Sequence, residues 1–292
     1  MNIKDQLDTR DKALYGKKNV ENSLALLYHE NSKMNVYSII EEHETISSFN
    51  NPYIISRSSQ PYKIYYTADT IDLSKFKGCE PSIDFFEVLK KRKSIRKYKS
   101  HYKISLKELY VLLQLSYGVT RKEKIINYDI DGYYGYRNVP SGGAMYPLEI
   151  YVVLFNSDQK SGLYHFNTKD ISLEKMKEGQ FQKELGKIVH AEPYVEMQNA
   201  SAVIFTTGII ERVSLKYGER GYRLMMIEVG LLAQNISLLA EAIDLSSCMV
   251  GGYYDEKVNE FLGIDGVFET INNVFVIGKK QSTIPIVKIK KS

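Results

Sequence analysis

The sequence predicts an α+β domain in which a central mixed sheet is flanked by helices. Short β-branched and apolar runs mark strands at 148–155, 202–207 and 273–278. A helical apolar stripe extends from about Arg220 to Ile243. Strands and helices are interspersed without an internal repeat or a low-complexity block, which is the pattern of an α+β fold.

The length, composition and net charge of the chain exclude several classes of protein. Its 292 residues are 43% apolar and 25% charged, which is enough for a sizeable core. The net charge of +4 is small and spread along the chain, so the sequence does not predict a basic surface that binds nucleic acid. Cys79 and Cys248 lack metal-site spacing, so neither zinc nor a disulfide framework is expected. With no signal peptide or uninterrupted apolar span, we expect a cytoplasmic protein without a membrane segment.

The domain boundary is predicted near residue 81. Residues 1–80 are polar and weakly periodic, and we interpret them as an N-terminal extension, whereas 81–292 form the globular domain. Within the extension, leucines at 24–28 predict a short helix, and 52–66 are expected to form an extended arm.

A basic segment follows the first helix of the globular domain. Ser82 is expected to cap a helix through 85–89, which ends in the basic run 90–98. Arg92 and Arg96, four residues apart, would then lie on one side of a helical turn. Such a run is typical of a solvent-exposed charged surface. It is also compatible with a phosphate-binding site, because a guanidinium group can donate two hydrogen bonds to phosphate oxygens.

The remaining elements follow from caps, glycines and periodicity. Ser105 and Glu108 form a capping box for a helix that Gly118 ends. The other expected elements are a loop at 120–138, a hairpin strand at 162–166, helices at 181–190 and 255–262, and an edge strand at 283–290. The helix at 220–243 is apolar nearly all round, so either the core or a subunit interface buries it.

The loop at 140–147 contains Ser-Gly-Gly between two prolines and leads directly into the strand at 148–155. Glycine has no Cβ, so this backbone could approach a flat or anionic cofactor closely. An ordinary tight turn has the same local pattern, and the loop alone does not separate the two interpretations.

Several segments together resemble a known family. The segments 92–98 and 140–149, with Gly251-Gly252 and 262–265, resemble the nitroreductase superfamily of FMN enzymes. Lys216-Tyr217, with the segments 220–223 and 28–33, makes the chain similar to the SagB-type dehydrogenases, the azoline oxidases of thiazole- and oxazole-modified peptide synthesis. The resemblance covers roughly residues 24–280, and it implies a nitroreductase-like fold and an intertwined homodimer with FMN at its interface.

The resemblance implies a role for each matching residue. The residues matched to the FMN phosphate and ribityl chain are Arg92, Ser94 and Arg96, with Lys93 beside the flavin. The residues matched to the flavin ring and its edge are Pro140, Ser141, Gly142, Gly143, Gly251 and Gly252. Lys279 resembles a second phosphate contact, and Lys216 and Tyr217 inherit a role in substrate dehydrogenation.

Azoline dehydrogenation explains why those residue types are needed. A flavin accepts a hydride at N5, and a proton must also leave the ring carbon. We hypothesise that Lys216, partly neutral through desolvation, or Tyr217 as a phenolate, takes that proton. Dioxygen is the expected reoxidant. On the residues alone, a surface lysine beside a packing tyrosine is the alternative.

Three functions remain open at this stage. The first is an FMN-dependent azoline dehydrogenase that acts on a modified peptide with a cyclodehydratase complex. The second is an NAD(P)H-dependent reductase of nitro or quinone compounds, and the third is a non-catalytic flavin-binding scaffold subunit. Many azoline oxidases have a longer N-terminal region that docks the peptide, so here we expect a partner protein to recognise the leader peptide.

Overall fold

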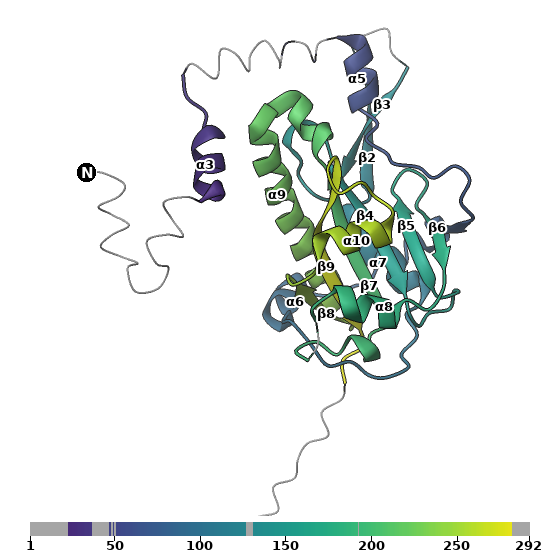
Figure 1. The fold of residues 1–292 in the computed structure, drawn as a ribbon. Coiled ribbons are helices and arrows are strands. Elements are labelled where there is room, and N and C mark those ends of the chain that lie inside the picture. Colours follow the sequence, from purple (N-terminus) through teal and green to yellow (C-terminus); the bar gives the residue numbers. More distant parts are fainter. Residues whose placement is uncertain are drawn as a thin grey trace, which may run out of the picture.

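A seven-stranded sheet forms the centre of the protein, in the order β1-β6-β5-β4-β7-β9-β8 (Figure 1). The computed structural model describes residues 23–36, 47, 49, 51–126, 131–191 and 193–281. The strands of the sheet are β1 (Thr70–Asp72), β4 (Leu148–Leu154), β5 (Gly162–Asn167), β6 (Ser172–Glu178), β7 (Ala202–Ile209), β8 (Ser246–Val250) and β9 (Glu269–Gly278). The helices are α3 (Leu24–Asn31), α5 (Pro52–Ser58), α6 (Phe85–Lys91), α7 (Leu106–Tyr117), α8 (Gln182–Ile188), α9 (Ile210–Ala242) and α10 (Asp255–Leu262).

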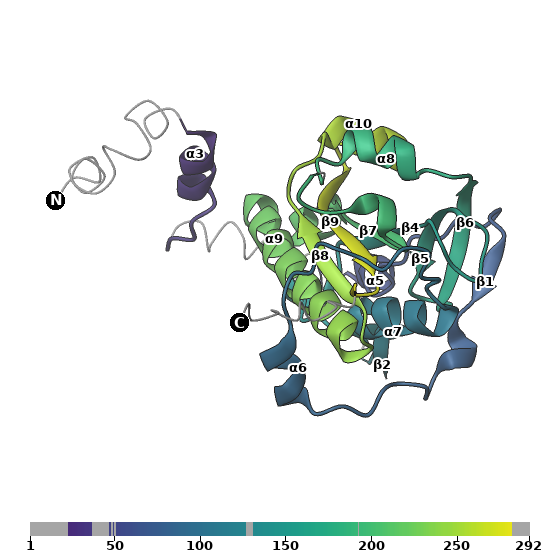
Figure 2. The same ribbon diagram turned by 90° about the horizontal axis from the view of Figure 1, so that it is seen from below.

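Helices cover both faces of the sheet, and β4 explains why. Ile150, Val152 and Leu154 pack into one hydrophobic cluster, together with side chains of α7 and α9. Tyr151 and Val153 point to the opposite face and pack into a second cluster with side chains of α10. Figure 2 shows α8 and α10 on one side of the sheet and α7 on the other. The continuous apolar run of β4 is therefore the pattern of a strand buried on two faces.

The predicted α+β class is confirmed, and so are the strands β4, β5, β7 and β9. The described strand pairs of the sheet are all antiparallel, whereas a mixed sheet was expected. The reason is the connection through α9, which makes β7 and β8 run in the same direction. β9 lies between them and runs in the opposite direction.

The predictions for two segments, 52–66 and 120–138, were wrong. The segment 52–66 begins with helix α5, because Asn51 caps it through Tyr53 N and Pro52 occupies its first position; only the part after Ser59 is extended. The expected loop at 120–138 contains a hairpin of β2 (Val119–Lys124) and β3 (Tyr133–Arg137). β2 is polar and largely exposed, and the two buried residues of β3 are Gly135 and Arg137, so the apolar alternation that marks a strand is missing.

The basic segment is also not helical. α6 begins after Asp84 rather than Ser82, and it ends at Lys91, where Arg92 has ψ 123°. Ile95 N donates to Ser247 O at 3.1 Å, so this segment lies against β8. Arg92 and Arg96 therefore do not share a helical turn, because backbone bonding to β8 replaces the helix.

Other predictions of local structure are confirmed. The short N-terminal helix is α3, the capping box of Ser105 and Glu108 starts α7, and Gly263 ends α10 in the left-handed conformation. β1 lies before the predicted boundary at residue 81 and pairs with β6, so the preceding segment supplies an edge strand of the main sheet. The expected edge strand at 283–290 lies outside the described residues.

The helix α9 is long and apolar enough to cross a membrane by length and composition. In the fold it packs along α7 and β8. One set of its apolar side chains, including Met225, Leu232 and Ile236, belongs to the core.

A buried ionic network lies within the sheet. His165 is fully buried, and its Nδ1 and Nε2 lie 2.8 Å and 3.0 Å from carboxylate oxygens of Glu174 and Glu149. Arg212 Nη1 lies 2.6 Å from the other oxygen of Glu149. Burial disfavours the charged imidazole, but the two carboxylates outweigh it and raise the pKa of His165. Burial likewise opposes ionisation of Glu149, yet Arg212 and His165 lower the pKa of that carboxyl to about 2.

We expect His165→Leu to lower the free energy of unfolding by about 3–5 kcal/mol, because it removes the group that bridges two buried carboxylates, those of Glu149 and Glu174. Urea unfolding measures this change. His29→Leu is the matched control, because His29 is exposed on α3. Equal unfolding free energies for the two variants would contradict the assigned role of the network.

Candidate functional site

The bend in α9 places two reactive side chains. The bend lies at Gly218, whose φ is 50° and ψ −138°, a conformation with positive φ that favours glycine. A Cβ at Gly221 would lie 2.8 Å from the carbonyl carbon of Val213, so only glycine permits this approach of the two segments. The sequence placed the start of this helix at Arg220, because Gly218 interrupts its periodicity. Lys216 and Tyr217 lie just before the bend.

The Ser-Gly-Gly loop lies directly against these two side chains. A methyl group added to Gly143 would lie 2.6 Å from Tyr217 Oη and 3.0 Å from Lys216 Nζ. One added to Gly142 would lie 3.0 Å from Leu224 Cδ1. The structure thus brings the predicted loop and the predicted catalytic pair together, although more than 70 residues separate them in the chain.

The loop backbone is held in an unusual conformation. Ala144 and Tyr146 have φ values of 56° and 42°, which are uncommon for residues with a Cβ. Tyr146 is fixed by three hydrogen bonds: its N–H donates to Ser141 Oγ, its hydroxyl accepts from Arg137 N, and its carbonyl accepts from Arg212. Such backbone strain persists only where the surroundings over-determine it, and it is concentrated at functional sites.

Glu228 lies behind the loop, and the sequence analysis missed it. Its side chain is 2% exposed, accepts from Tyr117 Oη at 2.6 Å and is hydrogen-bonded to the Ser141 hydroxyl. Burial raises the pKa of Glu228 to about 6, although Ser141, Tyr117 and Arg137 favour its charged form. An acidic residue inside an otherwise apolar helical stripe was the signal available in the sequence.

Burial shifts the two candidate catalytic groups in opposite directions, and in each case toward the neutral form. It lowers the pKa of Lys216, whose Nζ lies 5.0 Å from the centre of the Phe49 ring. It raises the pKa of Tyr217. A neutral amine is therefore more accessible here than a phenolate.

The basic segment lies at a different place. Arg92 is half-buried, and Lys93, Ser94 and Arg96 are exposed. Within the part of the chain that the structure describes, the Arg92 and Arg96 guanidinium groups have no hydrogen-bond or ion-pair partner. The backbone at Ile95 and Arg96 is bonded to Ser247 and Glu196, which positions the segment beside β8.

The remaining predicted residues lie near β8 and β9. Gly251 and Gly252 are exposed at the end of β8, and Gly251 has no atom within 4 Å of the position that a Cβ would take. The backbone carbonyl of Lys279 accepts a hydrogen bond from the N–H of Lys99. The Nζ of Lys279 lies 2.6 Å from Asp244 Oδ2. The exposed Pro140 begins the Ser-Gly-Gly loop.

The predicted site residues therefore form separate groups. The Ser-Gly-Gly loop lies near Leu224, whereas Ile95 contacts β8 just after the C-terminal end of α9. From Leu224 to Ala242 the helix rises roughly 27 Å. In Figure 1, α6 lies toward the opposite end of α9 from the bend.

The helix α3 contacts the bent end of α9. Tyr28 Oη donates to Glu219 O at 3.0 Å, Arg220 donates to Ser32 O at 3.2 Å, and Arg223 donates to Ser32 Oγ at 2.5 Å. Two segments that the resemblance singled out are therefore in direct contact. Their contact lies only a few residues beyond Lys216 and Tyr217.

Comparisons with known proteins identify the domain. A profile of the nitroreductase family matches residues 89–279. A Methanocaldococcus jannaschii protein named as a nitroreductase, MJ1384, is 33% identical over 61% of this chain and 83% of its own length. The structure also resembles that of a protein from Anabaena variabilis named as a nitroreductase, with TM-score 0.66 and 26% identity over 87% of this chain and 45% of that chain.

Two further relatives are named for peptide processing. The microcin B17-processing protein McbC of Escherichia coli is 27% identical over 44% of this chain and 49% of its own length. The trifolitoxin-processing protein TfxB of Rhizobium leguminosarum is 25% identical over 59% of this chain and 47% of its own length. The chain thus spans about half the length of these two relatives. A chain of the E. coli microcin synthetase McbBCD complex shares the fold, with TM-score 0.53 and 19% identity over 86% of this chain and 99% of that chain.

We expect Glu228→Gln to change how stability depends on pH. The folded-state pKa of about 6 exceeds the ordinary value of 4.5, so stability from this group is present below pH 4.5 and is lost as the pH rises through 6. Glutamine does not titrate. Relative to wild type, the variant should therefore gain about 2 kcal/mol of unfolding free energy between pH 4.5 and 7.

Urea unfolding at several pH values measures this difference. The exposed Glu184 on α8 supplies the control variant Glu184→Gln. If the unfolding free energies of Glu228→Gln and wild type differ by the same amount at pH 4.5 and at pH 7, the Glu228 carboxyl does not titrate in this range and the prediction is wrong.

Proposed function

The chain belongs to the nitroreductase family of flavin-dependent oxidoreductases, and we propose that it is a SagB-type, FMN-dependent dehydrogenase that converts peptide azolines to azoles. The observation that carries the proposal is the contact of Lys216 and Tyr217 with the Gly143 backbone. The likeness to McbC and TfxB, which are named for peptide processing, supports a peptide substrate.

The residues of the chain fit an FMN group. The partly exposed Gly142 and Gly143 present backbone without side chains, which suits a flat ring at close range. The Arg92 and Arg96 guanidinium groups have no protein partner in the described chain, and Ser94 adds a hydroxyl. Guanidinium and hydroxyl donors suit a terminal phosphate. Gly251-Gly252 offers a second exposed stretch of backbone for the flavin edge, and Lys279 a further cation.

FMN, when bound, supplies a hydride acceptor. The chain must then remove one proton from the azoline carbon. Lys216 is the proposed base, because its partly buried amine has a lowered pKa. Tyr217 keeps its proton, since burial raises the pKa of its hydroxyl. We assign it to orienting the substrate by a hydrogen bond. Glu228 holds Ser141 and thereby the loop.

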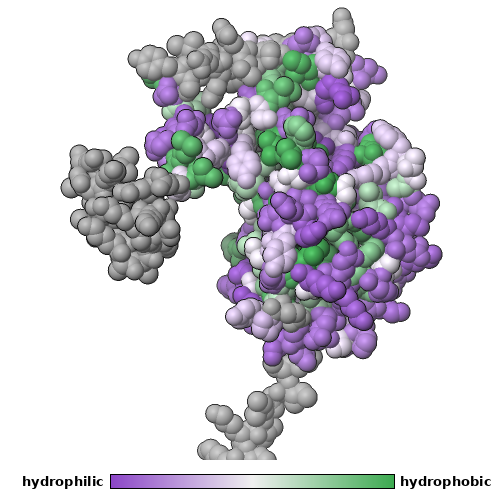
Figure 3. Space-filling model, viewed as in Figure 1, coloured by the Kyte–Doolittle hydropathy of each residue, from purple (hydrophilic) through white to green (hydrophobic). Residues whose placement is uncertain are grey.

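A second copy of the chain would complete the site. The Ser-Gly-Gly loop and the basic segment lie toward opposite ends of α9, which rises roughly 27 Å between Leu224 and Ala242. α6 and α9 also expose apolar side chains, among them Phe85, Phe86 and Ile227, which are 60%, 66% and 56% exposed. Figure 3 shows apolar patches gathered in the upper half of one face, above a mostly hydrophilic lower half. We propose a cytoplasmic homodimer in which both chains contribute to each FMN.

A cyclodehydratase complex is the proposed source of the azoline. One solved relative is a chain of a synthetase complex bound to a truncated precursor peptide. Reduction of small nitro or quinone compounds with NAD(P)H is the second candidate function. It is favoured by the higher identity to MJ1384, 33% against 27% for McbC. A non-catalytic flavin-binding subunit would need no base beside the loop.

We expect Lys216→Ala to lower the rate of azoline oxidation by roughly 10²–10⁴-fold, as loss of a general base does. Tyr217→Phe should lower it by roughly tenfold, the effect of one hydrogen bond. Both variants should retain FMN. The assay follows conversion of a thiazoline peptide to its thiazole by mass spectrometry.

Lys187→Ala on α8 is the control, because that lysine is exposed and lies on the other side of the sheet. Full turnover by both site variants would refute their catalytic roles. Rapid bleaching of the flavin by NAD(P)H, without oxidation of any azoline, would favour the reductase.

We expect Gly143→Leu to abolish FMN binding without unfolding the protein. The new side chain would collide with Tyr217 and Lys216, and φ 60° is strained for leucine. Visible absorbance of the purified protein reports bound flavin, and far-ultraviolet circular dichroism reports the fold. Gly186→Leu, at a position with no atom within 4 Å of the added Cβ, is the control. A yellow Gly143→Leu protein would contradict the placement of the flavin.

A further inference from the structure

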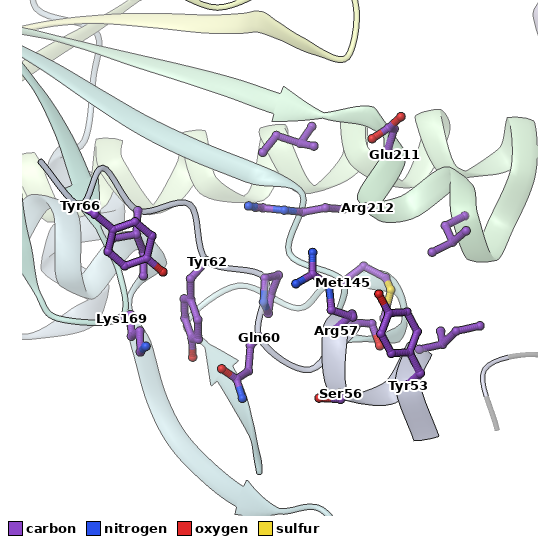
Figure 4. A pocket seen from close by; sticks show the side chains of 16 residues that line it. Tyr53, Ser56, Arg57, Gln60, Tyr62, Tyr66, Met145, Lys169, Glu211 and Arg212 are labelled. Atoms are coloured by element: carbon purple, nitrogen blue, oxygen red, sulfur yellow. The ribbon is translucent and has the colours of Figure 1, made fainter. Parts of the chain in front are cut away.

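A cavity of about 730 Å³ opens between α5 and the start of α9 (Figure 4). Its size is within the range of ligand-binding pockets. One wall is α5 and the segment after it, and the other is the start of α9. Met145 and Leu215 both line the cavity. Each is close in sequence to the contact between loop and helix, since Met145 follows Gly143 by two residues and Leu215 precedes Lys216.

The lining of the cavity is basic. Arg57, Lys169 and Arg212 face a single acidic residue, Glu211. Figure 4 shows the guanidinium groups of Arg57 and Arg212 reaching into the space between the two walls. Arg212 uses Nη1 to contact Glu149 and Tyr146, which fixes it in place and leaves donors on its other nitrogens.

A buried positive charge, behind the cavity wall formed by the segment after α5, adds to the positive electrostatic potential of the cavity. Arg137 is 6% exposed and donates from Nη2 to Pro61 O at 2.7 Å. Its Nε and Nη1 have no hydrogen-bond partner within the described residues. Pro61 and Tyr62, which line the cavity, both contact this guanidinium. The first turn of α9 also begins here without a side-chain cap at Ile209, and helix N-termini favour negative charge.

The wall also suits an extended chain. Residues 60–65 run without helix or strand structure along the cavity, and Gln60, Ser56 and Ser58 offer polar side chains. Tyr53, Tyr62 and Tyr66 add rings with hydroxyl groups, which pack on a peptide and can hydrogen-bond it. Extended peptides are commonly bound by such combinations of backbone, pockets and anchoring charges.

We propose that this cavity binds an acidic segment of the peptide substrate next to the reacting ring, with Arg57 and Arg212 paired to its carboxylate. The assignment rests on the proposed peptide-azoline function, which it extends to the sequence around the ring. The proposal predicts that acidic residues near the azoline strengthen binding of the peptide and that basic residues weaken it.

The test is a binding measurement that needs no turnover. Two fluorescein-labelled hexapeptides carry one thiazole, already oxidised, followed by either Asp-Glu or Asn-Gln. Fluorescence anisotropy with the FMN-loaded protein gives both affinities. We expect the acidic peptide to bind roughly fivefold more tightly, the effect of one partly exposed ion pair. Arg57→Ala should remove this preference, and Arg57→Glu should reverse it.

Lys183→Ala is the matched control, because it removes an exposed cation from α8. It should leave the preference intact. Equal affinities for the two peptides in the wild-type protein would overturn the proposal. Weaker NADPH binding in Arg57→Ala, with unchanged peptide affinities, would also overturn it and assign the cavity to a dinucleotide.

The two proposals can fail separately. If the protein oxidises no azoline but prefers the acidic peptide through Arg57, the cavity assignment stands and the reaction is wrong. If it oxidises azolines with no charge preference, the reaction stands and the cavity assignment is wrong.

Discussion

The contact between the Gly142-Gly143 backbone and the bent end of α9 is the constraint on which the candidate site depends. A Cβ on Gly143 would occupy the space next to Tyr217 Oη and Lys216 Nζ. The bend exists because Gly218 adopts a positive φ and Gly221 lets two backbone segments touch. Without these glycines, Lys216 and Tyr217 would lie along a straight helix rather than against the loop.

Buried charges hold this contact in place. Glu228 accepts from Tyr117, while Arg137 stacks 4.5 Å from the centre of the Tyr117 ring. Arg212 connects Tyr146 of the loop to Glu149 of β4. Charged groups are costly to bury, so their number around one strained loop indicates that loop geometry, rather than stability alone, is what they preserve. Two of these groups, Arg137 and Arg212, also add positive charge to the neighbouring cavity.

The distribution of the predicted site residues is the reason for proposing a second copy of the chain. The loop and the basic segment lie along the same long helix, but toward opposite ends. A helix is a rigid spacer, so no small adjustment of side chains brings the two groups to one flavin. A second copy would provide the missing group without changing the fold, which agrees with the exposed apolar side chains of α6 and α9.

Local signals in the sequence, namely apolar runs, caps and glycines, predict the α+β class and the core strands β4, β5, β7 and β9. The Ser-Gly-Gly loop and the Lys216-Tyr217 pair are singled out by short motifs that resemble a known family. The bend of α9 at Gly218, the course of Arg92 to Arg96 along β8 rather than in a helix, and the support of Ser141 by Glu228 became visible only in the folded chain. Each depends on contacts between residues far apart in the chain, where packing and backbone bonding override local propensity. The pairing of Arg57 with Arg212 in one cavity also depends on tertiary contacts, because folding brings α5 next to the start of α9.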